Sequence, residues 1–204
     1  MKTQYLLTVI SILIIAGCTT VQRSDRVSTS LSAREYNSIA SRYMERPTFV
    51  SIEEMSDGST VLMVQMDTYS VPSTYRDLNL SAEQRNALRH SQVRFLKDHV
   101  AEYVEAIDKF AEWEELARER GDAFTREINR VPTWANMGSG NLVFSFHSGN
   151  DQNHFLVVAF AAAGTVLEDQ ALYFDSSNIT ELKRLLVGFS NDSLQRTDID
   201  SVYR

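Results

Sequence analysis

One stretch of the chain is apolar on both faces of a strand, and it restricts the fold more than any other stretch. Phe155 to Ala163 are nine consecutive apolar residues that end at Gly164. A strand with one exposed face alternates apolar and polar residues, whereas a continuous apolar run is typical of a strand covered on both faces. We therefore predict a central strand over residues 154–162, in a sheet that is packed on both sides.

This strand belongs to a predicted group of three. Residues 141–147, 154–162 and 166–174 are rich in strand-forming side chains, and short turns separate them. Short turns favour antiparallel pairing, so the three strands are expected to form a meander.

A second group of strands is predicted earlier in the chain. Residues 48–55 and 60–67 are rich in β-branched and apolar residues. Between them lies Ser56-Asp57-Gly58-Ser59, which is typical of a hairpin turn.

Short helices are predicted at both ends of the domain. Ser32 and Glu35 match a capping box, and apolar residues recur at helical spacing over 32–45 before Pro47. Asn178 and Glu181 match a second capping box. The apolar positions that follow it are Ile179, Leu182, Leu185, Leu186 and Phe189.

The longest helical pattern begins at Ser81. Apolar residues at spacings of three and four run from Val93 to Phe110, and the same phase continues toward Pro132. An unbroken helix over 81–131 would be about 75 Å long at about 1.5 Å per residue. We therefore expect a helix to about Arg120, a break near Gly121, and a second helix or a continuation to Arg130. A long coiled coil is the alternative, although bulky residues outside the stripe, such as Trp113, favour packing on a sheet.

These elements predict the fold class α+β. The expected architecture is an antiparallel sheet, made of the hairpin and the three-strand meander. One long central helix and shorter N- and C-terminal helices are expected to pack on it.

The first residues of the chain form a targeting pattern. Lys2 precedes an apolar stretch of eleven residues, Leu6 to Ala16, whereas a helix that spans a membrane needs about 20. The stretch leads into Ile15-Ala16-Gly17-Cys18, and Cys18 is the only cysteine of the protein.

This segment resembles bacterial lipoprotein precursors, which carry such a lipobox. The resemblance implies that residues 1–17 are removed by signal peptidase II and that Cys18 carries acyl chains such as palmitate. Because Thr19 rather than Asp follows the cysteine, it also implies anchoring in the outer membrane, facing the periplasm. In a host with one membrane, the same signal implies the outer face of the plasma membrane. An ordinary cleaved signal, or a short buried helix with an incidental cysteine, is the alternative.

The predicted organisation follows from these boundaries. Residues 1–17 are a lipoprotein signal peptide, and the polar residues 18–30 are a flexible tether. A single α+β domain spans 31–189, and the polar residues 190–204 are a flexible C-terminal tail.

Composition excludes several functions. A single cysteine allows neither an internal disulfide nor a cysteine-based metal cluster. With 20 Lys and Arg against 27 Asp and Glu, the net charge of −7 argues against nucleic acid as a partner. The common catalytic and nucleotide-binding motifs are absent, and no pattern indicates a cofactor. The segment Gly138-Ser139-Gly140 is expected to be a loop, in which the glycines supply turn conformations.

The candidate metal-binding residues are His147, Asp151 and His154. The two histidines bracket a six-residue turn, and a symmetric register would place them opposite each other. Imidazole and carboxylate groups are ligands that zinc accepts. The alternative is an ordinary polar hairpin end. A second candidate is the acidic face of the long helix, which is also explained as a solvated surface. Its residues are Asp98, Glu102, Glu105, Asp108, Glu112, Glu114 and Glu115.

The sequence therefore favours a lipoprotein that acts without catalysis. It is expected to be held at the membrane by its acyl chains and to bind or assemble with an envelope protein or ligand. The alternative is an envelope hydrolase or metal-dependent enzyme that uses His147, Asp151 and His154.

Overall fold

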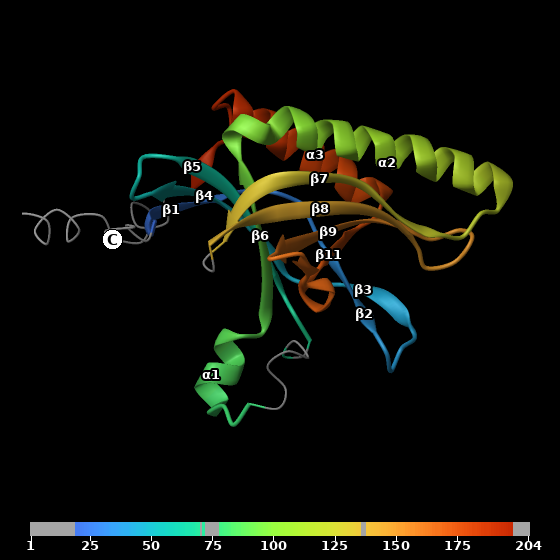
Figure 1. Ribbon diagram of the computed structural model, residues 1–204, viewed down its shortest axis with the longest axis horizontal. Coiled ribbons are helices and arrows are strands. Elements are labelled where there is room, and N and C mark those ends of the chain that lie inside the picture. Colours follow the sequence, from blue (N-terminus) through green and yellow to red (C-terminus); the bar gives the residue numbers. More distant parts are fainter. Residues whose placement is uncertain (1–18, 70, 72–77, 136–137, 198–204) are drawn as a thin grey trace, which may run out of the picture.

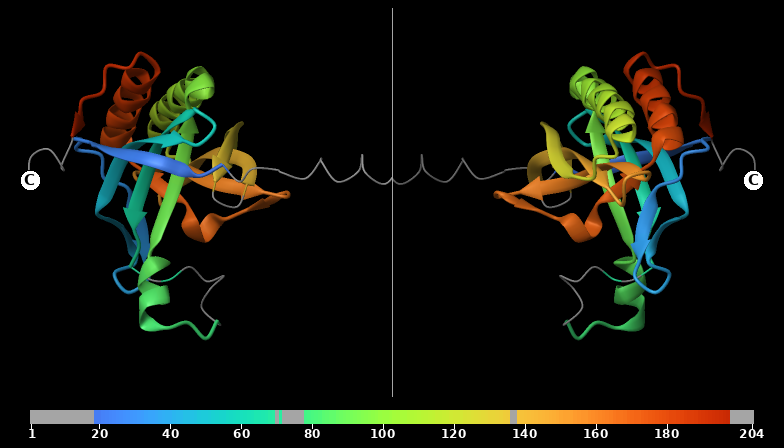
Figure 2. Two further views of the ribbon diagram at one scale, coloured as in Figure 1. Left: turned by 90° about the vertical axis from the view of Figure 1, so that its left-hand side faces the viewer. Right: turned by 90° about the vertical axis from the view of Figure 1, so that its right-hand side faces the viewer.

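The computed structural model describes residues 19–69, 71, 78–135 and 138–197. Two antiparallel sheets form the body of the molecule, and helices α2 and α3 lie next to each other on one side of it (Figure 1). The predicted α+β class, with antiparallel pairing and one long central helix, is confirmed. The predicted hairpin and meander do not form one sheet, because they lie in two separate sheets. Figure 2 shows the same two helices side by side from both ends.

The first sheet has the strand order β12-β1-β4-β5-β6. Its strands are β1 (Val21–Val27), β4 (Thr48–Met55), β5 (Thr60–Asp67), β6 (His90–Leu96) and β12 (Arg196–Thr197). The predicted hairpin over 48–55 and 60–67 is confirmed with the same boundaries as β4 and β5.

The second sheet has the strand order β3-β2-β11-β9-β8-β7, and β10 pairs with β9. Its strands are β2 (Arg34–Asn37), β3 (Arg42–Glu45), β7 (Thr125–Ala135), β8 (Gly138–Ser148), β9 (His154–Ala162), β10 (Thr165–Val166) and β11 (Leu172–Phe174). The predicted central strand is β9, in which Leu156 and Val158 are fully buried. The third strand of the predicted meander is divided into β10, the short 3-10 helix η4 (Glu168–Gln170) and β11.

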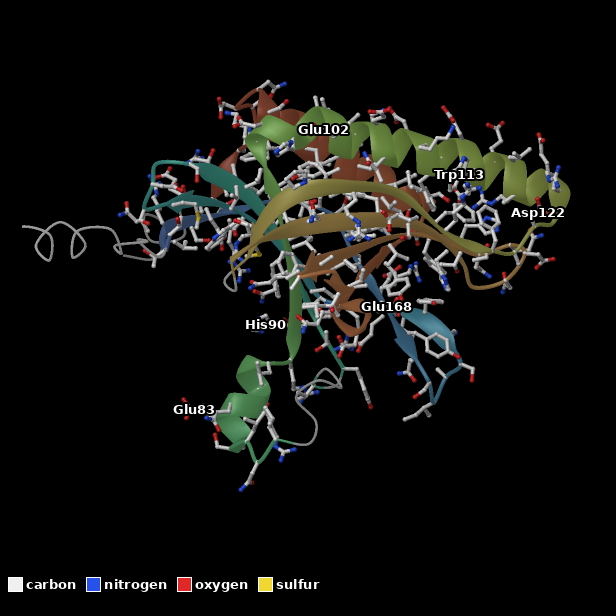
Figure 3. All side chains as sticks on the ribbon, viewed as in Figure 1. Glu83, His90, Glu102, Trp113, Asp122 and Glu168 are labelled. Atoms are coloured by element: carbon white, nitrogen blue, oxygen red, sulfur yellow. The ribbon has the colours of Figure 1, made fainter. Side chains whose placement is uncertain are left out.

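Helices α2 (Val100–Arg120) and α3 (Ser176–Ser190) bury their apolar stripes against the sheets. Tyr103 and Phe110 of α2 are fully buried and contact Phe144 and Phe146 of β8. Trp113, labelled in Figure 3, continues this row against Phe146. Helix α2 ends where expected, because Gly121 has a φ of 69° and closes the helix in the left-handed conformation.

The predicted helix over 32–45 is wrong, because these residues form the hairpin of β2 and β3. The side-chain oxygen of Asn37 accepts hydrogen bonds from the backbone of Ile39 and Ala40 and so stabilises a turn where the helix would continue. The backbone of Ser41 completes the reversal with a φ of 50°. A local capping pattern was therefore overridden by turn chemistry.

The predicted long helix from Ser81 is also wrong over most of its length. Residues 82–87 form the short helix α1, 90–96 form β6, 97–99 form the 3-10 helix η3, and only from Val100 does the chain become α2. Ser91, Val93 and Phe95 are buried at a spacing of two, which is a strand period. The predicted continuation to Arg130 is strand β7.

The flexible segments predicted on both sides of the domain are ordered in part. Val21 to Val27 form β1, so residues 18–30 are not a tether throughout. Arg196 and Thr197 pair with β1, and Leu194 packs against the core, so residues 190–204 are not a tail throughout.

Residues 1–18, with the predicted signal peptide and Cys18, lie outside the described part of the chain. Among the residues that are described, no helix is long and apolar enough to cross a bilayer.

Candidate functional site

The structure does not bring His147, Asp151 and His154 together. His154 pairs with Ser148 across the β8–β9 turn, and His147 pairs with Phe155. In the symmetric register that we predicted, His147 would pair with His154, so the observed pairing is shifted by one residue. Because neighbouring residues of a strand point to opposite faces, the shift puts the two histidines on opposite faces of the sheet. No group of three His, Cys, Asp or Glu side chains in the described ranges is placed to hold a metal ion.

His147 of β8 instead contacts side chains of β3 and β7 within the second sheet. Its Nε2 atom lies 2.6 Å from the Tyr43 hydroxyl, and its Nδ1 atom lies 2.9 Å from Oγ1 of Thr125. Burial lowers the pKa of His147, which favours a neutral ring. Burial, with Tyr173 and Tyr36 nearby, raises the pKa of Tyr43 to about 12. These contacts make His147 a structural residue.

A pocket of about 460 Å³ lies between the β2–β3 hairpin, the β8–β9 turn and the start of α3. It forms because β11 pairs with β9 only as far as Phe174, opposite Leu156, before the chain enters α3. The first two residues of β9, His154 and Phe155, therefore have a strand neighbour on the β8 side only. The pocket occupies the space beside them.

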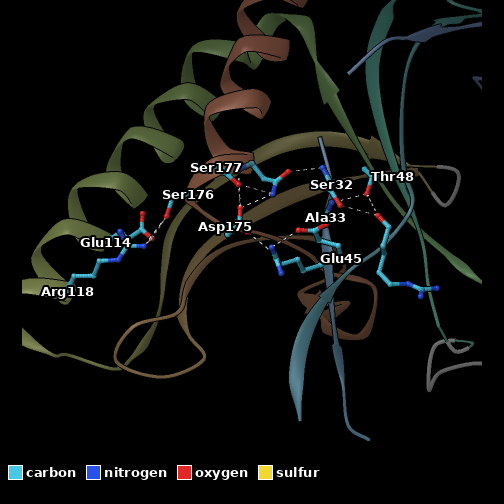
Figure 4. Close-up of polar contacts among 12 residues, drawn as sticks. Ser32, Ala33, Glu45, Thr48, Glu114, Arg118, Asp175, Ser176 and Ser177 are labelled. Carbon is cyan, nitrogen blue, oxygen red and sulfur yellow. Dashed lines mark hydrogen bonds and ion pairs between the residues drawn. The ribbon is translucent and has the colours of Figure 1, made fainter. Parts of the chain in front are cut away.

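Three arginines line this pocket, which is unusual in a chain with an excess of acidic residues. We call it the arginine pocket, after Arg34, Arg42 and Arg118. Arg34 is paired on both sides, with Asp175 and Glu45, each at 2.8 Å (Figure 4). Arg42 is exposed and has no ion pair within the described parts of the chain, so its charge is available to a ligand.

Arg118 belongs to a cluster that joins α2 to α3 at the edge of the pocket. Its Nη2 atom lies 2.7 Å from the buried carboxylate of Glu114 and 3.1 Å from the hydroxyl of Ser176 (Figure 4). The Ser176 hydroxyl donates to the same carboxylate. Glu114 thus holds two donors in place beside the pocket.

His154 lines the pocket and is only 2% exposed. Neither of its ring nitrogens makes a close, well-aligned hydrogen bond within the described residues, although the backbone of Asp122 interacts with the ring. The ring centroid of Phe146 lies 5.1 Å from that of His154. Burial lowers the pKa of His154, although Glu114 and the backbone of Asp122 oppose this effect. A buried polar group without a partner costs about 1–3 kcal/mol, so this histidine calls for an explanation in terms of a ligand or a bound water.

The start of α3 differs from the predicted capping pattern. Asp175 is the N-cap residue, and its side chain accepts a hydrogen bond from the backbone of Asn178. Burial alone would raise the pKa of Asp175, but hydrogen bonds from Asn178 and Ser177, together with Arg34, outweigh it and lower the pKa. The Asn178 side chain accepts from the backbone of Ser32 instead, at 2.7 Å, and so joins α3 to the segment before β2.

The acidic face of α2 is largely compensated by local partners. Asp108 pairs with Lys183 of α3, and Glu112 pairs with Lys109. Glu102 lies 2.7 Å from the ring of His99. These pairs favour the interpretation of this face as a solvated surface.

The arginine pocket was not predicted from the sequence. Its three arginines come from β2, β3 and α2, and no local motif connects them. No protein-family model matches the chain, and no curated protein shows significant similarity to it.

Proposed function

We propose that the protein is a lipid-anchored envelope protein that binds, without catalysis, a polar ligand carrying an anionic group in the arginine pocket. The anchor is inferred from the lipobox that ends at Cys18, which lies outside the described residues. The outer membrane, facing the periplasm, is the expected location because Thr19 follows the cysteine.

The observation that carries the binding proposal is His154. A buried imidazole without a well-aligned hydrogen bond among the described residues is costly. A ligand that enters the adjacent pocket and hydrogen-bonds to the ring would remove that cost. A polar group that is placed beside a pocket and available to hydrogen-bond a ligand is typical of a recognition site.

The chemistry of the pocket favours an anionic group on the ligand. Arg42 offers a guanidinium that forms no ion pair with the described residues, and the geometry of this group suits carboxylate and phosphate groups. Asn150, Gln152 and Asn153 of the β8–β9 turn add amide groups, and Tyr36 adds a half-exposed ring. The ligand is therefore expected to be polar over most of its surface.

The hydrolase alternative relied on His147, Asp151 and His154 acting together. His147 and His154 lie on opposite faces of the sheet, which does not support a shared site for these residues. We therefore favour binding over catalysis.

The anchor is tested by replacing Cys18 with Ser. Wild-type protein should carry acyl chains in the mass spectrum and sediment with membranes, whereas Cys18→Ser should be unacylated. Equal processing and membrane association of the two proteins would contradict the anchor.

Binding is tested by NMR titration of the unlipidated mature chain. The probes are inorganic phosphate, acetate, soluble cell-wall fragments that carry carboxylates, and a neutral chito-oligosaccharide. An anionic probe should shift the ring signals of His154 in a saturable way. Arg42→Gln should weaken that binding about 10-fold, the effect of one charged hydrogen bond of about 1.5 kcal/mol.

The control is Arg85→Gln, since Arg85 lies on α1 outside the pocket. It should bind as the wild type does. Binding that leaves the His154 ring unchanged, or equal effects of the two substitutions, would contradict the proposed site.

A further inference from the structure

We infer that the end of the domain formed by the β4–β5 turn (residues 56–59) lies in the headgroup layer of the membrane. The inference rests on the proposed acylation of Cys18. It concerns which surface of the folded domain meets the lipid, and thereby which surface faces the aqueous space.

The chain is fixed to the domain almost directly after Cys18. The backbone N–H of Thr20 donates to the hydroxyl of Ser56 at 3.0 Å, and the backbone N–H of Ser56 donates to the carbonyl of Thr20 at 2.8 Å. The next residue, Val21, already pairs with Met55. Thr20 is therefore held against the β4–β5 turn directly before β1 and does not belong to a linker.

The remaining distance is too short for a tether. Only Thr19 lies between Cys18 and Thr20, and the two steps of the chain from Cys18 to Thr20 span at most about 7 Å. The polar layer on each side of a bilayer is about 5–7 Å thick, given about 30 Å of hydrocarbon within about 40–45 Å in total. Acyl chains that enter the hydrocarbon from Cys18 consequently hold the β4–β5 turn at headgroup depth.

The surface at this end suits such a position. A pocket of about 450 Å³ lies beside Thr19, and the partly exposed Leu96 and Trp134 line it over the buried Met55 and Val61. Asp57, Lys97 and Asp98 contribute charged groups. A partly exposed Trp among apolar and charged groups matches the mixed polarity of a membrane interface.

The arginine pocket lies at the other end of the molecule. The β8–β9 turn and the C-terminal end of α2 are on the far side from the β4–β5 turn (Figure 1). Asp122, labelled in Figure 3, marks that end. Anchoring at the β4–β5 turn therefore directs the arginine pocket away from the membrane.

The experiment uses the lipidated mature protein in vesicles of phosphatidylethanolamine and phosphatidylglycerol. Ser59→Cys and Glu119→Cys introduce single reactive thiols at exposed positions of the β4–β5 turn and the end of α2, since acylated Cys18 does not react. Each thiol carries a fluorophore. A lipid-attached nitroxide should quench the label at residue 59 several-fold more than the label at 119, and aqueous iodide should show the reverse order.

A linker variant separates tethering from orientation. About 12 Gly and Ser residues inserted between Thr19 and Thr20 add about 19 Å of average reach, so lipid quenching at residue 59 should fall to the level at 119. Equal quenching at the two positions without the linker, in protein shown by mass spectrometry to be acylated, would overturn the orientation alone. Absence of acyl chains would overturn the proposed anchor and this inference with it.

Discussion

The carboxylate of Glu114 on α2 accepts a hydrogen bond of 2.5 Å from the hydroxyl of Ser176, the first residue of α3. The same carboxylate is paired with Arg118 and is almost fully buried. A buried carboxylate is stable only when its oxygens are satisfied, so the relative position of the two helices is fixed at this point. The arginine pocket opens beside it.

Glu114→Ala should lower the free energy of unfolding by about 1.5–3 kcal/mol, the loss expected for hydrogen bonds to a charged group. Urea denaturation of the unlipidated mature chain measures the change. The matched control is Glu115→Ala, because Glu115 is exposed on the same helix, and its effect should stay within about 0.5 kcal/mol. Equal effects of the two substitutions would contradict the role of Glu114.

Arg94 and Glu53 form an ion pair of 2.7 Å inside the first sheet, with side chains that are 5% and 7% exposed. Arg94→Met should destabilise the protein by about 3–5 kcal/mol, because the charge of Glu53 stays buried without a partner. Combining it with Glu53→Leu should recover most of the loss. Denaturant melts of the single and double variants test this, and a double variant no more stable than Arg94→Met would refute it.

Gly140 lies in β8, opposite Thr133, where the neighbouring strand β9 comes very close. A Cβ atom at this position would lie under 3.0 Å from the backbone oxygen of Ala161 and from the ring of Phe160. Gly140→Ala should therefore cost about 1–3 kcal/mol through overpacking. Thermal melts of the unlipidated mature chain measure this cost, and Ser139→Ala, at the exposed neighbouring position, should be nearly neutral in them. An unchanged melting temperature for Gly140→Ala would show that the strands can separate at no cost.

Glu181 joins α3 to the segment before β2. A hydrogen bond from Arg184, together with the hydroxyl of Thr29, lowers the pKa of Glu181 to about 2, although burial opposes the shift. A folded-state pKa below the unfolded value of about 4.3 stabilises the protein above that value, and the stabilisation is lost as the pH falls toward 2. Glu181→Gln should therefore be destabilising at pH 7 and much less so near pH 2.5. A difference from wild type that does not shrink with acidification in urea titrations would contradict this linkage.

The sequence predicted best those elements whose pattern had one interpretation. Strands β4, β5 and β9 have the predicted boundaries, because a hairpin turn or an unbroken apolar run marks each of them. The end of the long helix at Gly121 was also predictable, because glycine adopts the positive φ that closes a helix. The sequence failed over 90–96, where Val93 and Leu96 fit a helical stripe while Ser91, Val93 and Phe95 fit a strand. Pairing with β5 decided between the two.

The site was harder to predict than the fold because it depends on register and on distant segments. One residue of register places His147 and His154 on opposite faces, and the spacing of histidines in a sequence does not specify it. The glycines of Gly138-Ser139-Gly140 lie in a strand rather than in a loop, where close packing explains Gly140. Arg34, Arg42 and Arg118 meet only in three dimensions.

The pairing of β1 with β12 has a consequence for how the protein is made. Arg26 lies opposite Thr197, so the edge of the first sheet joins residues 171 positions apart in the chain. Such non-local pairing carries a large loop-closure entropy and is slow to form. The sheet cannot be completed until residues 196 and 197 have been synthesised, so the edge of β1 stays open to other strands until then.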